Sequence, residues 1–171
     1  MLKNQKQGVG NAQKYSAWAE NAYTWKYIEK PSFVRNLKKD LNSRTRIIEA
    51  GCGAGRTINF LLQNGAKESN ILGIDVDSEL LAYSKKSFPK VHYIHNSISE
   101  KLPIEENIYD MVTCHNVLHY LNQKQFTTAI KNFYSWLKKD GILFIMTPHP
   151  VRMSKDLTAY FFSCILVFHQ K

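Results

Sequence analysis

The stretch Ile47–Thr57, IIEAGCGAGRT, decides the fold of this chain. It begins as a short apolar strand, continues as a loop with glycine at every second position, and ends at the start of a helix. Glycine allows a tight turn and a close approach of the backbone to a ligand, because it has no Cβ. A dinucleotide-binding loop would read G-x-G-x-x-G and carry phosphate. Here Glu49 precedes the first glycine by two residues, so the loop suits a ligand with an ammonium group better than a pyrophosphate.

Strand and helix patterns alternate on both sides of this loop. We expect strands at 46–50, 71–75, 91–95, 109–114 and 142–147, and helices at 55–63, 78–87 and 122–138. This alternation predicts a parallel sheet with right-handed crossovers, which binds ligands at the carboxyl ends of its strands. Before the first strand, an aromatic helix at 14–29 and a second helix at 33–41 are predicted, with a break at Pro31.

The glycine loop resembles the first motif of the class I S-adenosylmethionine-dependent methyltransferases, E/D-x-G-x-G-x-G. Further segments resemble family motifs in the same order along the chain. The acidic end of the second strand lies at 71–77. An LP pair lies at 102–103, with the approach to the fourth strand at 109–112. The segment after that strand is 117–121, and the entry to the fifth strand is 137–145.

The resemblance implies an α/β fold: a Rossmann-like, doubly wound, mostly parallel sheet with strand order 3-2-1-4-5. It also suggests three parts: a helical lid or cap at 1–45, a core that binds S-adenosylmethionine at 46–150, and an atypical hydrophobic tail at 151–171. The implied function is methyl transfer from S-adenosylmethionine to a small-molecule acceptor.

The segment after the fifth strand departs from the family pattern. A full sheet of this family adds a helix and an antiparallel pair of strands, and residues 148–171 are too few for those elements. We therefore expect the C-terminal antiparallel strands to be missing or replaced by a short tail, as in a truncated member. The strand at 142–147 would then lie at an exposed edge, and such edges tend to pair. We expect part of 158–168 to cover that edge, or the chain to self-associate.

The resemblance also assigns the cofactor site. Asp75, at the end of the second strand, would accept hydrogen bonds from both ribose hydroxyls, although the alternative is an N-cap role that Asp77 fills more naturally. Glu49 would face the methionine end of the cofactor. The other predicted contacts are the loop backbone, the base and the end of the fourth strand: Gly51, Cys52, Gly53, Val76, Asn96, Ser97 and His115. At Asn96 or Ser97 the family usually has Asp.

Methyl transfer from a sulfonium is an in-line displacement, which requires alignment and the exclusion of water more than an acid–base pair. Where the acceptor must lose a proton, His119 and His115 are the candidate catalytic bases and His149 is a third. Each could instead be a loop histidine with no catalytic part. The segment 114–117, CHNV, lacks the Asn/Asp-Pro-Pro-Tyr motif of amino-directed nucleic-acid enzymes, which favours a small-molecule acceptor.

Composition limits the other function classes. The 171 residues suit one domain, no apolar run is long enough to span a membrane, and the three cysteines match no zinc spacing. We expect a cytoplasmic protein without a metal. The net charge of +9 is concentrated in residues 1–46, which hold ten Lys/Arg against three Asp/Glu. An RNA-directed methyltransferase is thus one alternative, though we do not favour nucleic acid as the partner. A cofactor-binding remnant without turnover is another, and a nicotinamide enzyme is disfavoured by Glu49 and Arg56.

Overall fold

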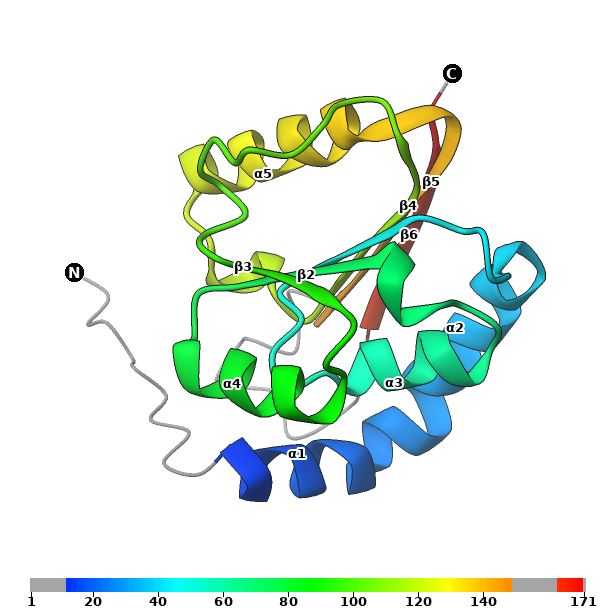
Figure 1. Ribbon diagram of the computed structural model, residues 1–171, viewed down its shortest axis with the longest axis vertical. Coiled ribbons are helices and arrows are strands. Elements are labelled where there is room, and N and C mark those ends of the chain that lie inside the picture. Colours follow the sequence, from blue (N-terminus) through cyan, green and yellow to red (C-terminus); the bar gives the residue numbers. More distant parts are fainter. Residues whose placement is uncertain (1–11, 149–162, 171) are drawn as a thin grey trace, which may run out of the picture.

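The sheet of this protein carries helices on both faces, as Figure 1 shows. The structure is a computed structural model that describes residues 12–148 and 163–170. Its strands are β1 (Ile47–Ala50), β2 (Ile71–Asp75), β3 (His92–His95), β4 (Tyr109–His115), β5 (Leu137–Pro148) and β6 (Ser163–His169). They lie in the order β3-β2-β1-β4-β5-β6, and all neighbouring pairs are parallel except β5 with β6. The predicted order 3-2-1-4-5 is confirmed.

The helices are α1 (Ala12–Asn21), α2 (Lys30–Leu37), α3 (Arg56–Gln63), α4 (Ser78–Ser87) and α5 (Gln123–Trp136). A π-helical turn, η1 (Trp25–Glu29), joins α1 to α2, and short 3₁₀ turns are η2 (Lys38–Asp40), η3 (Glu68–Asn70) and η4 (Leu118–Tyr120). Helices α3 and α4 cover one face of the sheet and α5 covers the other (Figure 1). The direction of winding changes between β1 and β4, where a doubly wound sheet binds its ligand.

Alternate residues of the central strands feed two apolar cores. Ile47 and Met111 face α3 and the N-terminal helices, whereas Ile48 and Val112 face α5. Strands buried on both faces are near-continuous in apolar residues, as the sequence predicted.

Helix α2 belongs to the first of these cores. Phe33 and Leu37 are completely buried there, so this part of the segment expected to form a lid packs on the sheet itself. The predicted break at Pro31 is wrong. Pro31 lies near the start of α2, and the helical backbone continues from η1 into α2 without interruption.

The expectation that the C-terminal antiparallel strands are missing is also wrong in part. β6 pairs antiparallel with β5 from Ile142↔His169 to Pro148↔Ser163. The expectation that residues from 158–168 cover the edge of the fifth strand is therefore confirmed. The run CILVF within β6 is rich in β-branched and aromatic side chains, which favour strands. His149 and most of the predicted 151–171 tail lie outside the described residues.

Candidate functional site

The glycine loop between β1 and α3 uses its backbone N–H groups within the chain. Gly51 N–H and Cys52 N–H both donate to Ile74 O, at 2.7 and 3.0 Å, and Gly55 N–H donates to Cys52 O at 3.0 Å. Gly53 N–H donates to the Asp75 carboxylate at 2.7 Å. A phosphate-binding loop must offer such groups to the ligand. This loop therefore provides close backbone approach and little capacity for phosphate.

The glycines of this loop serve different purposes. All three have positive φ, and at Gly51 and Gly55 a Cβ would collide with neighbouring side chains at 2.1 and 2.7 Å. At Gly53 a Cβ would meet only Leu80 Cδ1, at 3.8 Å. The open space at Gly53 is thus where a ligand can approach the backbone.

Asp75 is held rigidly at the end of β2. Its Oδ2 accepts from Gly53 N–H and its Oδ1 accepts from Asp77 N–H at 2.9 Å. Burial raises the pKa of this carboxyl, and the two N–H donors oppose that rise. Asp77 caps α4 by accepting hydrogen bonds from the N–H groups of Glu79 and Leu80. The prediction that Asp77 fills the N-cap role more naturally than Asp75 is confirmed.

Glu49 lies deeper than the glycine loop. Its side chain is 1% exposed and accepts a hydrogen bond from the Thr113 hydroxyl on β4. Burial raises the pKa of Glu49 to about 8, against the lowering effect of hydrogen bonds from Thr113 and Thr57. The Arg56 guanidinium also lowers this pKa, but it stays near 8, so the carboxyl is protonated near neutral pH.

The predicted base-binding residues lie beyond Asp75. Val76 is 65% exposed, which leaves its side chain open for a planar ligand. Asn96 N–H donates to Asp75 O at 3.0 Å, and the Asn96 side-chain oxygen accepts from Ser97 N–H at 2.7 Å. The Ser97 hydroxyl is 2.8 Å from that of Ser99. Asn96 and Ser97 are therefore close to Asp75, although each already has an internal partner.

His115, predicted both to bind the cofactor and to act as a base, has a buried side chain. Its imidazole stacks on Trp25 at a centroid distance of 5.8 Å and lies edge-on to Phe33. Nε2 is 3.2 Å from Glu29 Oε2, and Nδ1 is 3.4 Å from the Thr57 hydroxyl. Burial lowers the pKa of His115, which the neighbouring Glu29 carboxylate only partly offsets. Its surroundings suit a structural contact better than proton exchange with an acceptor.

His119 lies in η4, after β4, with its ring 4.0 Å from that of Tyr120. His119 is partly buried, whereas Tyr120 is 66% exposed. Tyr15 of α1 is close enough to Arg56, Tyr120 and Asp75 for their charges to act on its phenol, whose pKa is raised chiefly by burial. Tyr15 thus lies near the carboxyl ends of the strands. The sequence predicted an aromatic helix at 14–29 within a lid or cap, but not which residues Tyr15 would lie near.

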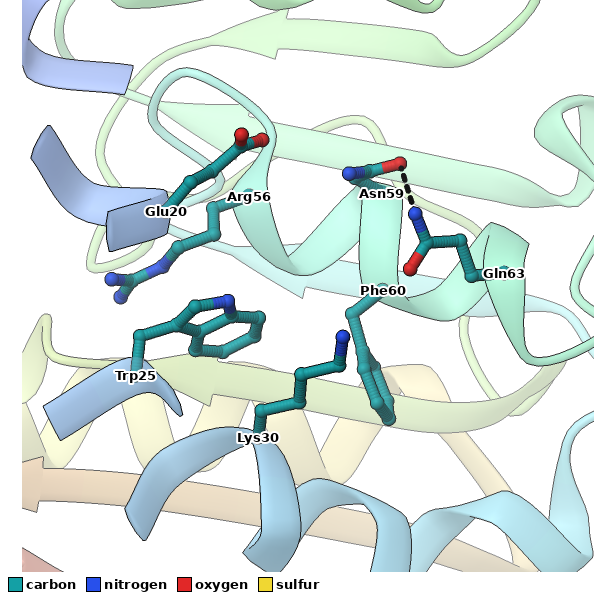
Figure 2. A pocket seen from close by; sticks show the side chains of 7 residues that line it. All are labelled: Glu20, Trp25, Lys30, Arg56, Asn59, Phe60 and Gln63. Atoms are coloured by element: carbon teal, nitrogen blue, oxygen red, sulfur yellow. Dashed lines mark hydrogen bonds between the residues drawn. The ribbon is translucent and has the colours of Figure 1, made fainter. Parts of the chain in front are cut away.

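A hollow of about 200 Å³ lies beside this site, between the N-terminal helices and α3 (Figure 2). The Arg56 guanidinium lies over the Trp25 ring there, 4.5 Å from its centroid. None of the predicted cofactor residues lines this hollow. Its lining residues are Glu20, Trp25, Lys30, Arg56, Asn59, Phe60 and Gln63.

Comparison with known proteins agrees with this geometry. The profile of the family described as "Methyltransferase domain" matches residues 47–141, which is more than half of the chain. The chain belongs to the class I S-adenosylmethionine-dependent methyltransferase domain family. The matched region contains the glycine loop, Asp75, and strands β1 to β4, so the family predicted from the sequence motifs is confirmed.

Individual relatives are more distant. The uncharacterized methyltransferase sll0829 of Synechocystis is 27% identical over 104 residues, which cover 61% of this chain and 47% of that protein. The chain spans about half the length of the curated relatives it matches.

Two solved structures share the fold. A TehB-like methyltransferase from Corynebacterium glutamicum has a TM-score of 0.65 at 24% identity, covering 81% of this chain and 71% of that one. The N-methyltransferase NodS from Bradyrhizobium japonicum, solved with S-adenosylhomocysteine, has a TM-score of 0.68 at 19% identity, covering 79% and 68%.

Among residues 12–148 and 163–170, no group of three or more His, Cys, Asp or Glu could hold a metal ion. In the same part of the chain, every helix is too short or too polar to cross a membrane.

Proposed function

We propose that this chain binds S-adenosylmethionine at the carboxyl ends of β1, β2 and β4, and transfers its methyl group to a small-molecule acceptor. One observation carries the proposal: the Asp75 carboxylate is fixed by Gly53 N–H at the one glycine of the loop that faces open space. The exposed Val76 follows it directly. An acidic group beside an apolar surface is what a ribose joined to a base requires.

The residues of the chain would act mainly by binding S-adenosylmethionine and orienting it. Each Asp75 oxygen already accepts one N–H and retains a lone pair for a ribose hydroxyl. Glu49, buried behind the loop, would favour a positively charged ammonium group at the methionine end. Bound S-adenosylmethionine would supply an electrophilic methyl group on a positively charged sulfur.

Exclusion of water would fall to α1 and the turn after β4. Tyr15 and Tyr120 lie on these two elements near the site, and good alignment of the reacting groups is worth on the order of 7–11 kcal/mol. His119 remains the candidate base. We propose a structural role for His115, because its ring is enclosed by Trp25, Phe33 and Glu29.

Two features favour a small-molecule acceptor. The aromatic side chains of Tyr15 and Tyr120 suit a compact organic acceptor, and the CHNV segment lacks the motif of amino-directed nucleic-acid enzymes.

The experiment is calorimetric titration of the chain with S-adenosylmethionine and S-adenosylhomocysteine, using Asp75→Asn and the matched control Asp77→Asn. Both variants remove one carboxylate from the same loop. Wild-type binding in the micromolar range, about −8 kcal/mol, is expected. Asp75→Asn should weaken it by roughly tenfold or more, because a charge-assisted hydrogen bond is lost, while Asp77→Asn should leave it nearly unchanged. A folded wild-type chain that binds neither ligand would contradict the proposal, and binding without turnover across acceptors would support a remnant.

A further inference from the structure

Glu29 joins three parts of the molecule that are far apart in the sequence. It ends η1 in the N-terminal helical segment, defined here as residues 12–37, and it is 3% exposed. Its Oε2 lies 3.2 Å from His115 Nε2 and 3.4 Å from Arg56 Nη2. Its Oε1 accepts a hydrogen bond from Asn116 Nδ2 at 3.2 Å.

These contacts compensate for the burial of a charge. An unpaired carboxylate in this environment would be strongly disfavoured, because burial removes its hydration. Burial opposes ionisation of Glu29, but the contacts with His115, Arg56 and Asn116 outweigh it and lower the pKa to about 2. Glu29 is therefore ionised at neutral pH, and the N-terminal helical segment cannot leave the core without separating this carboxylate from all three partners.

The partners of Glu29 adjoin the glycine loop on both sides. Arg56 is the first residue of α3 and directly follows Gly55. Asn116 has φ +57 and its N–H donates to Met146 O at 2.8 Å, which fixes the turn after β4. The next residue, Val117, lies against Gly51 so closely that only glycine fits there.

The same cluster fixes α1 above the strand ends. Arg56 Nη1 donates to Ala19 O at 2.9 Å, and α1 carries Tyr15 toward Asp75 and Tyr120. The carboxylate of Glu29 therefore pairs with the same guanidinium that donates a hydrogen bond to α1. Docking of the N-terminal helical segment and the shape of the glycine loop thus share one set of contacts.

We propose that Glu29 is a positioning residue that couples docking of the N-terminal helical segment to the affinity of the cofactor site. This proposal rests on the function proposed above. Glu29 does not touch the predicted ligand position itself, and acts through Arg56, Asn116 and Val117.

The test compares Glu29→Gln with Glu20→Gln in the full chain. Glu20 is a matched control, because it is an exposed glutamate of the same segment. Three quantities are measured at one pH: the dissociation constant for S-adenosylhomocysteine, amide hydrogen exchange of residues 12–37, and the melting temperature. Glu29→Gln should weaken binding by about tenfold, which corresponds to about 1.4 kcal/mol, and should speed exchange in 12–37. Glu20→Gln should change neither.

The outcomes are distinguishable. A residue that only stabilised the fold would lower the melting temperature of Glu29→Gln and leave the dissociation constant of the folded protein unchanged, which would overturn the proposal. Unchanged exchange in 12–37 would also overturn it. If the wild-type chain binds no S-adenosylhomocysteine, the proposed function fails and the proposed coupling fails with it. If the wild-type chain binds it and Glu29→Gln binds it equally well, only the coupling is overturned. Should Glu29→Gln not fold, Asn116→Ala, which removes one of the three contacts, is judged by the same criteria.

Discussion

Gly51 and Val117 are packed so closely that a Cβ at position 51 would lie 2.1 Å from Val117 Cγ2. The first residue of the glycine loop is therefore fixed by the turn after β4, and not only by its own backbone. Two strands that meet at the switch point of the sheet share this contact. The contact distinguishes Gly51, which packing requires, from Gly53, which faces open space.

Alanine substitutions at these two glycines should have different effects. Gly51→Ala combines a φ of +79 with the collision on Val117, and should lower the free energy of unfolding by about 2–5 kcal/mol. Gly53→Ala, with a φ of +50 and only Leu80 nearby, should cost about 1–2 kcal/mol of stability. Its larger effect should be on affinity for S-adenosylhomocysteine. Urea denaturation and calorimetry measure both, and tight binding by a folded Gly53→Ala would contradict a ligand at that position.

Glu49 should make the protein less stable as pH rises. Its pKa is about 8 in the folded protein against an ordinary value of 4.5, so between these values the folded state binds the extra proton. The stability that protonated Glu49 contributes is fully present below about pH 4.5 and is lost as the pH rises through 8. Glu49→Gln should remove this decline. The measurement is the urea midpoint of both proteins between about pH 5 and 8.

Subtracting the two profiles isolates Glu49 from the groups that act in the opposite direction. The lowered pKa values of His115 and Glu29 contribute stability that is lost as pH falls, and both residues are present in each protein. Parallel profiles for the wild type and Glu49→Gln would mean that Glu49 is ionised in the folded state.

Cofactor binding should release a proton from Glu49. The carboxyl is protonated at neutral pH, and an ammonium group bound nearby would lower its pKa because opposite charges favour ionisation. Titration with S-adenosylhomocysteine near pH 7, in buffers with different ionisation enthalpies, should show the release of up to about one proton. Glu49→Gln is the control and should show no release from this position. Equal proton release by both proteins would place the ammonium group away from Glu49.

The sequence predicted the parts of the molecule that local patterns determine. Strands buried on both faces and the glycine loop have strong signatures, so β1, β2, β4 and the position of Asp75 followed from the residues alone. The role of Asp77 as an N-cap followed in the same way. Pro31 was misjudged because proline usually ends a helix, whereas here the helical backbone continues from η1 into α2 without interruption.

The cluster of Glu29, Arg56 and His115 was not predicted. Its members come from η1, α3 and β4, and no local spacing connects them. His115 was assigned to the site because of its place at a strand end, which says nothing of the helical segment that packs on its ring. The covering of the β5 edge by residues from 158–168 was predicted from the exposed edge, whereas the antiparallel register from Ile142↔His169 to Pro148↔Ser163 was not.

Removing β6 should cause the chain to self-associate. In the full chain β6 pairs with β5 along Ile142–Pro148, and without it the backbone N–H and C=O groups on that side of β5 would lack partners. Such an edge recruits another strand. A chain that ends at residue 162 should elute from a sizing column as a larger species than the full chain, increasingly so at higher concentration. If instead the shortened chain elutes as a stable monomer, another segment must protect the edge of β5, and the stabilising role assigned here to β6 would be wrong.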